Sequence, residues 1–140
     1  MPRRFAPCTS GLRAPLPLNV HLLTLRPTAP GQLLLRLSHQ FGIDEDPSLS
    51  GLAAVDLATL FAQWEVTAAE EVSLTANQNK SAILARRRLA AQWTVADGDR
   101  PHPWRQLSFN FSANSTAVLG PLEIKTFAVS VVARVSSTTI

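Results

Sequence analysis

The chain has 140 residues, of which 46% are hydrophobic and 16% charged, so it can bury the core of one domain and is not of a disordered composition. Thirteen Lys and Arg against ten Asp and Glu give a net charge of only +3. The arginines at 86–88 are therefore interpreted as a solvated edge or loop, and we expect no nucleic-acid partner. The single cysteine, Cys8, excludes an internal disulfide and a cysteine metal cluster. No apolar run reaches the ~20 residues of a membrane helix, so we expect no membrane partner.

The N-terminal third predicts an antiparallel hairpin. Residues 1–15 are proline-rich and are expected to form a poorly ordered leader. Residues 18–26 and 32–41 alternate as strands, with Pro27 expected to stop the first and Pro30-Gly31 to complete the turn. In the second strand one face carries Leu33, Leu35, Leu37, His39 and Phe41.

The middle of the chain predicts shorter elements. An acidic loop at 44–47 is followed by a short strand at 52–56, and Asp56 is placed to cap one helical turn over 57–61. Strand pieces are expected at 64–67 and 72–75. The segment 83–95 has helix-favouring Ala, Leu and Arg but no apolar stripe, and its end, 89–95, is interpreted as a strand.

The C-terminal third alternates again. Leu107, Phe109 and Phe111 predict a half-buried strand, and residues 122–135 form the longest alternating segment. Short strands with frequent turn residues indicate an all-β fold, an antiparallel β-sandwich with at most a short helical turn, over residues 16–135, with 136–140 as a tail.

The same patterns predict the core. Asn110 and Lys125 are expected to point to solvent. Ile124 and Phe127 are an odd number of positions apart, so both can be buried only if a bulge intervenes near Lys125-Thr126, or if the strand is covered on both faces. The residues expected to be largely buried are Leu35, Leu37, Phe109, Phe111, Ile124, Phe127 and Val129.

The titratable residues show no pattern of catalysis. The histidines, His21, His39 and His102, have neither the spacing of a zinc site nor an accompanying nucleophile motif. A histidine on a strand is more often a hydrogen-bonded, half-buried residue. Asp44, Glu45 and Asp46 could ligate calcium, but their spacing better fits a solvated turn. We therefore predict no catalytic residue and no metal ligand in this chain.

Three sequons of the form N-x-[ST] mark candidate sites of N-glycosylation: Asn79, Asn110 and Asn114. Asn110 lies on the polar face of its expected strand, where a glycan would be tolerated. The N-terminus has positive charges but no apolar segment of a signal peptide, so the sequence leaves the location of the chain itself open.

Five segments, taken in order, resemble one protein family. They read LPLNVHLLTL (16–25), LLLRLSHQFGIDEDPSLS (33–50), VDLATLF (55–61), SLTANQNKS (73–81) and GPLEIKTF (120–127). They are similar to LPxNVHLLTL, LLLRLxHxF with an acidic loop, VDLxxLF, LxANQ and PxEIRTF in the C-terminal region of lysosomal-type (in plants, vacuolar) α-mannosidases of glycoside hydrolase family 38. The resemblance covers residues 16 to about 132 and leaves out the leader and the tail.

The resemblance implies the C-terminal sandwich of a glycosidase, of galactose-mutarotase or immunoglobulin-like type. Family members are retaining, zinc-dependent enzymes that trim mannose from N-glycans in the lysosome or vacuole, or as secreted proteins. Their zinc ligands and nucleophile lie in a domain that nothing in this sequence matches. The resemblance thus implies a structural domain that is inactive alone and whose partners are the catalytic and middle domains of the same enzyme, in cis or as a separate chain.

Two expectations follow for the surface. At least one of Leu23, Leu25 and Leu34 should be unusually exposed, where the rest of the enzyme would pack. A second group of polar motif residues either faces the missing domains or is satisfied internally: Asn19, His21, Arg36, His39, Asn77 and Gln78.

The alternative function is an independent secreted β-sandwich module that binds carbohydrate or protein. An exposed cluster of aromatic side chains would favour it, because sugar rings stack on them. The chain has no Tyr, and Trp64, Trp93 and Trp104 are scattered. The enzyme-domain interpretation is therefore preferred.

Overall fold

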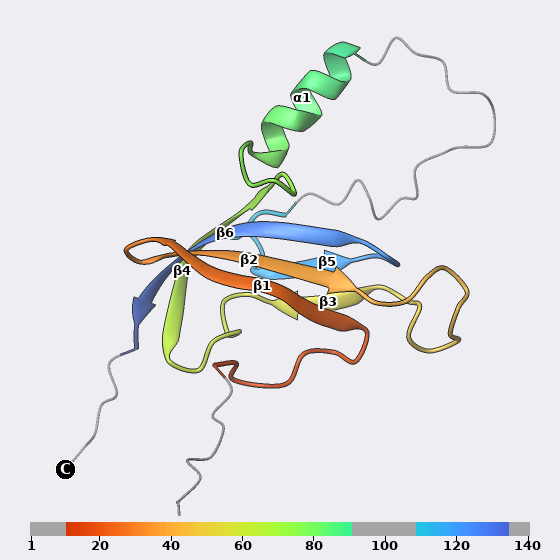
Figure 1. Cartoon of the computed structure of the whole chain (residues 1–140), viewed down its shortest axis with the longest axis horizontal. Coiled ribbons are helices and arrows are strands. Elements are labelled where there is room, and N and C mark those ends of the chain that lie inside the picture. Colours follow the sequence, from red (N-terminus) through yellow and green to blue (C-terminus); the bar gives the residue numbers. More distant parts are fainter. Residues whose placement is uncertain (1–10, 91–108, 135–140) are drawn as a thin grey trace, which may run out of the picture.

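The computed structural model describes residues 11–90 and 109–134. Figure 1 shows strands in two layers, with the single helix of the described part projecting from them. The all-β, antiparallel sandwich is confirmed. In chain order the elements are β1 (Val20–Ala29), β2 (Gln32–His39), β3 (Ala53–Asp56), β4 (Trp64–Val72), α1 (Lys80–Ala90), β5 (Thr116–Leu119) and β6 (Ile124–Ala133).

The larger layer is a four-stranded sheet in the order β1-β2-β6-β4. The expected hairpin of β1 and β2 is present and turns at Pro30-Gly31, where Gly31 has a φ of 70°. The expectation that Pro27 ends the strand is wrong, because β1 continues to Ala29 and Pro27 pairs with Leu33. Since β1 is an edge strand, a missing N–H costs no hydrogen bond to a second neighbour.

The smaller layer pairs β3 with β5, from Ala53 opposite Leu119 to Asp56 opposite Thr116. Asp56 caps the chain as expected, since its Oδ1 accepts a hydrogen bond from the Ala58 amide at 3.0 Å. The segment after it is a turn rather than a helical turn, with a single 3.4 Å bond from the Leu60 amide to the Leu57 carbonyl. Its side chains Leu57, Leu60 and Phe61 nevertheless belong to the core.

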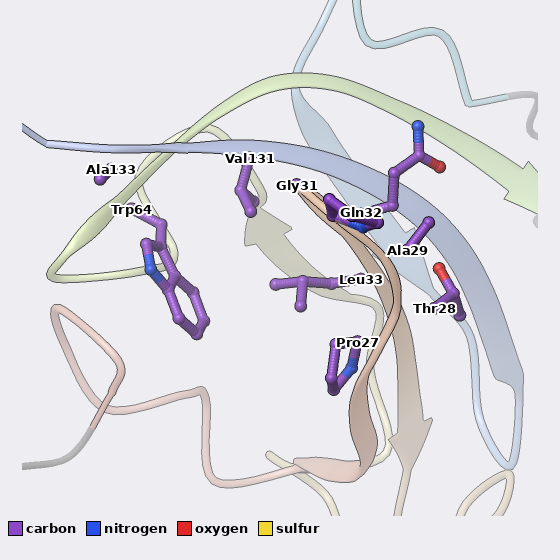
Figure 2. Close-up of a pocket in the computed structure, with 10 residues that line it drawn as sticks. Pro27, Thr28, Ala29, Gly31, Gln32, Leu33, Trp64, Val131 and Ala133 are labelled. Atoms are coloured by element: carbon purple, nitrogen blue, oxygen red, sulfur yellow. The ribbon is translucent and has the colours of Figure 1, made fainter.

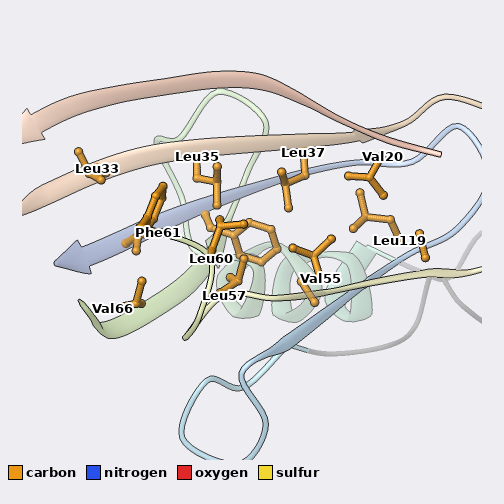
Figure 3. Close-up of a cluster of buried hydrophobic side chains, with 14 residues drawn as sticks. Val20, Leu33, Leu35, Leu37, Val55, Leu57, Leu60, Phe61, Val66 and Leu119 are labelled. Atoms are coloured by element: carbon orange, nitrogen blue, oxygen red, sulfur yellow. The ribbon is translucent and has the colours of Figure 1, made fainter. Parts of the chain in front are cut away.

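The core lies between the two layers (Figure 3). Four of its predicted members, Leu35, Leu37, Phe127 and Val129, are buried as expected. Phe109 and Phe111 are only partly buried and pack against the core from one side. The Phe109 and Phe127 rings meet edge to face, with centroids 5.1 Å apart.

The expected orientations of Ile124 and Lys125 are wrong. Ile124 is 44% exposed, and Lys125, expected in solvent, is only 4% exposed. The ladder between β2 and β6 runs from Gln32–Ser130 to Ser38–Ile124 without a bulge. Strict alternation therefore places Lys125 on the face of Phe127 and sends Ile124 to the other face.

The strand expected around Phe109 and Phe111 is also wrong within the described residues. Residues 111–113 form a turn that joins Asn110 to Asn114 in an isolated bridge. The Asn110 carbonyl accepts hydrogen bonds from the amides of Ala113 (3.2 Å) and Asn114 (2.8 Å). The exposure predicted for Asn110 is confirmed.

Two further boundaries differ from the expectation. β4 is one continuous strand with an irregularity between Val66 and Ala68, where two pieces were expected. The second piece, expected at 72–75, is wrong beyond Val72, because Leu74 and Thr75 lie in a turn. Helix α1 has eleven residues, longer than the single turn expected for this chain. The strand predicted over 89–95 is wrong at Leu89 and Ala90, which end α1, and the rest lies outside the described residues. Within the part of the chain that is described, no helix has the length and apolarity needed to cross a membrane.

Candidate functional site: polar motif residues and an apolar hollow

His39 is buried at the end of β2, beneath the loop of residues 41–51. Its Nε2 lies 2.8 Å from the Gly51 carbonyl oxygen, and its Nδ1 lies 3.2 Å from the Phe41 amide nitrogen. A neutral ring with the proton on Nε2 donates to Gly51 and accepts from Phe41. Both ring nitrogens therefore hold the loop, as expected of a structural histidine.

Asn19, just before β1, also holds the loop of residues 41–51. Its Nδ2 donates to the Leu49 carbonyl at 3.1 Å and lies 3.3 Å from the Nε2 of His39. Its own carbonyl accepts from the Gln40 amide at 2.8 Å. The two buried motif residues are thus satisfied within the domain. His21 instead is exposed on β1, and His102 lies outside the described residues.

The acidic loop uses its carboxylates to shape the backbone. Asp46 Oδ1 accepts hydrogen bonds from the amides of Ser48 and Leu49, both at 2.8 Å, and from the Ser48 hydroxyl at 2.9 Å. These bonds, the Leu49 amide first, lower the pKa of Asp46. Glu45 accepts from the Gly42 amide at 2.6 Å. The turn interpretation therefore accounts for the contacts of Asp46 and Glu45.

A second polar motif forms the turn after β4. The Ser73 hydroxyl donates to Asn77 Oδ1 at 2.9 Å and accepts from the Gln78 amide at 3.3 Å. The guanidinium of Arg36 donates twice to the Leu74 carbonyl, at 3.2 and 2.7 Å. Arg36 and Asn77 are therefore also satisfied internally, and Arg36 fastens this turn to the outer face of the four-stranded sheet.

The three sequon asparagines are exposed. Asn110 Oδ1 accepts from the Ser112 amide at 3.1 Å, and Asn114 Oδ1 accepts from the Thr116 amide at 2.9 Å. The carbonyl of Asn79 accepts the first hydrogen bonds of α1. At Asn110 and Asn114 the side-chain oxygen is engaged, and the Nδ2 to which a glycan is attached is not used in that bond.

The described residues, 11–90 and 109–134, contain no group of three His, Cys, Asp or Glu side chains that could hold a metal ion. The one buried histidine among them is committed to backbone groups, as described above.

The described surface has an apolar hollow of about 510 Å³ at the hairpin end of the four-stranded sheet. Figure 2 shows Trp64, Leu33 and Pro27 around it. Trp64 is 37% exposed, and its ring meets Phe61 edge to face with centroids 5.6 Å apart. Leu25, two positions before Pro27 on β1, is also 37% exposed.

The prediction of an exposed leucine is confirmed by Leu23 (46% exposed) and Leu25, whereas Leu34 is buried. Sequence reasoning did not find the hollow itself. Trp64 and Pro27 are far apart in the chain, and only the pairing order β1-β2-β6-β4 brings their strands to one sheet. The signal available was the expected exposure of a leucine at position 23 or 25 in the first strand.

Fold and contacts define this chain as an antiparallel β-sandwich domain whose buried Asn19 and His39 bond to its own backbone. A family model described as the glycosyl hydrolases family 38 C-terminal beta sandwich domain matches residues 19–127. The chain belongs to this family.

Curated relatives agree with the family. The chain is 42% identical to lysosomal alpha-mannosidase of Bos taurus over 124 residues and to that of Homo sapiens over 125 residues. It is 37% identical to an alpha-mannosidase of Canavalia ensiformis over 113 residues. These matches cover 87%, 87% and 80% of this chain, but only 12%, 11% and 11% of the relatives. The chain thus spans about a ninth to an eighth of their length.

Proposed function

We propose that this chain is the structural C-terminal domain of a retaining, zinc-dependent α-mannosidase that hydrolyses α-mannosides of N-glycans. The observation that carries the proposal is the family match over residues 19–127, to a domain that forms 11–12% of α-mannosidases. Zinc and the catalytic carboxylates belong, in this proposal, to the remainder of the enzyme. The catalytic and middle domains are then its partners, in cis or as a separate chain.

The domain contributes stability and shape in this proposal, and no step of the reaction. Retaining hydrolysis requires a nucleophile and an acid/base held ~5–5.5 Å apart across the substrate. The carboxylates of Asp46 and Asp56 are instead engaged by backbone and hydroxyl donors in the domain itself. This supports a role outside the chemistry.

The test is hydrolysis of a chromogenic α-mannoside by the purified chain, with and without added zinc. We expect no turnover above a buffer blank in either condition. Zinc-dependent turnover that co-purifies with the chain through a second chromatographic step would contradict the structural role. Full-length lysosomal alpha-mannosidase of Bos taurus serves as the positive control.

The parent enzyme is proposed to reside in the lysosome or vacuole, or to be secreted, because relatives are named lysosomal. Glycosylation of Asn79, Asn110 or Asn114 would accompany that location. The engaged Oδ1 atoms of Asn110 and Asn114 support both as acceptors. A mass decrease on enzymatic removal of N-glycans from the protein expressed in a secretory host tests this, with Asn→Gln variants assigning the sites.

The runner-up is an independent secreted module that binds carbohydrate or protein. The exposed ring of Trp64 beside the hollow favours it, since a sugar ring could stack there. The test is titration of the chain with mannose and oligomannose, followed by tryptophan fluorescence. A saturable fluorescence change that the Trp64→Phe variant lacks would support this second function. We expect no saturable change.

A further inference from the structure

The hollow lies on the inner face of the four-stranded sheet, beyond the end of the small layer. Leu33 pairs with Val129 and with Pro27, so all three face the side that carries the core residues Leu35 and Phe127. The covering strands β3 and β5 have only four residues each. Their residues Val55 and Leu119 lie opposite Leu37 and Val20 (Figure 3), whereas the hollow lies at the hairpin end of the sheet.

The lining of the hollow suits an apolar occupant. None of its lining residues is charged, and Trp64 stands at its side, held by the edge-to-face contact with Phe61. An ordered tryptophan beside an apolar hollow loses little conformational freedom on binding, which is why such residues dominate many interfaces.

The path of the chain indicates what lies there. Gly11 and Arg13 run beside the residues just before Trp64, with bonds from the Ala62 amide to the Gly11 carbonyl (3.1 Å) and from the Arg13 amide to the Leu60 carbonyl (2.9 Å). In the relatives this domain is C-terminal and forms only 11–12% of the polypeptide. Most of such an enzyme therefore enters the domain at this end.

We propose that the hollow binds apolar side chains from the part of the α-mannosidase polypeptide that precedes this domain, with Trp64 as the central contact. The inference rests on the proposed function and adds to it the surface through which the domain joins the enzyme. It commits to the same enzyme rather than to a second copy of this chain, because Gly11, the first described residue, is bonded to Ala62, two positions before Trp64.

The test uses the full 140-residue chain and bovine lysosomal alpha-mannosidase shortened by its matching C-terminal segment. Calorimetric titration should give a 1:1 complex. Should the shortened enzyme not fold alone, co-expression and the yield of co-purified complex replace the titration. Trp64→Ala should weaken binding at least tenfold.

Ala133→Arg, which adds a charge at the hollow without removing a core side chain, should do the same. Leu122→Ala is the matched control, because Leu122 is exposed at the opposite end of the domain, and it should bind like the parent. Circular dichroism verifies that all three variants are folded.

The outcomes separate the two proposals. If the parent chain does not bind or co-purify with the shortened enzyme, the proposed function and this inference are both wrong. If it binds and both hollow variants bind equally well, the proposed function stands and the hollow is not the interface. If sedimentation shows that the chain dimerises and Trp64→Ala abolishes the dimer, the occupant is a second copy and the inference is overturned.

Discussion

Lys125 is buried on the inner face of the four-stranded sheet, near the carboxylates of Glu71 and Glu123. Burial lowers its pKa, which the two carboxylates oppose and the ammonium of Lys80 reinforces. Glu71 accepts from the Lys80 ammonium at 2.6 Å, while its Oε2 is buried without a hydrogen-bond partner. Position 125 is thus a point of electrostatic cost on the buried face of this sheet.

The lowered pKa of Lys125 predicts that the stability of the fold depends on pH. The pKa of Lys125 is lower in the folded state than its ordinary 10.5, so the unfolded chain binds more protons between the folded pKa and 10.5. The free energy of unfolding therefore rises with pH in that window through this group. Lys125→Met should flatten the rise, measured as urea midpoints from neutral pH to pH 10.5. Parallel curves for parent and variant would contradict the assignment.

Phe127 carries the second residue-scale prediction. Its side chain is fully buried and contacts Phe109. Phe127→Ala should lower the free energy of unfolding by about 3–5 kcal/mol, because it removes a large buried side chain and leaves a cavity. Thermal denaturation measures the effect. Ile124→Ala, three positions away and exposed, is the control, and equal losses for the two variants would mean that the sheet faces are assigned wrongly.

At the scale of elements, side chains of the larger sheet hold the neighbouring loops and turns in place. The loop of residues 41–51 is hydrogen-bonded to the side chains of His39 and Asn19, and the turn after β4 is hydrogen-bonded to the side chain of Arg36. In both cases a side chain in or next to a strand bonds to backbone groups of a loop or turn. Such bonds fix loop conformation because a carbonyl left unpaired beneath a loop is costly.

His39→Ala should release the loop of residues 41–51. We expect a loss of about 1–3 kcal/mol, since the Gly51 carbonyl and the Phe41 amide lose their partner. Limited proteolysis should cut between residues 42 and 51 faster than in the parent. His21→Ala, on the exposed edge strand, should leave both quantities unchanged. An unaltered cleavage rate in the His39 variant would show that the loop is held by other contacts.

At the scale of the whole molecule, the two sheets share one hydrophobic core. Residues of β2 and β6 from the larger sheet pack on those of β3 and β5 and on Leu57, Leu60 and Phe61 between them. Neither layer buries its inner face alone, so neither is stable without the other. Helix α1 projects from this unit and adds little to it (Figure 1).

The shared core predicts a single cooperative unfolding transition. In a variant with Trp93→Phe and Trp104→Phe, fluorescence reports on Trp64 alone. Its urea midpoint should coincide with that of far-ultraviolet circular dichroism. Two separated midpoints would show that the layers unfold independently.

Much of this architecture was predictable from local pattern. β2 and β6 alternate over many residues, and their inward positions Leu35, Leu37, Phe127 and Val129 are buried as expected. The errors have more than one cause: Phe111 alternates with polar residues but belongs to a turn, and residues 83–90 of α1 carry helix-favouring residues without an apolar stripe. The sequence left two possibilities for His39 and Arg36: hydrogen bonds within the domain or contact with missing domains. It could not decide between them, because their partners are backbone groups of loops and turns.

The sequence by itself determined the fold class, the hairpin and the family, because period-two alternation, turn residues and ordered motifs are local properties of the chain. Tertiary structure decided which face of β6 is inward and hence that Lys125 is buried. Because the ladder between β2 and β6 has no bulge, Ile124 faces away from the core and Lys125 faces toward it. It also decided that Pro27 and Trp64 border one hollow. That proximity depends on the strand order, which brings residues distant in the chain into one sheet. The local sequence at either position does not reveal this order.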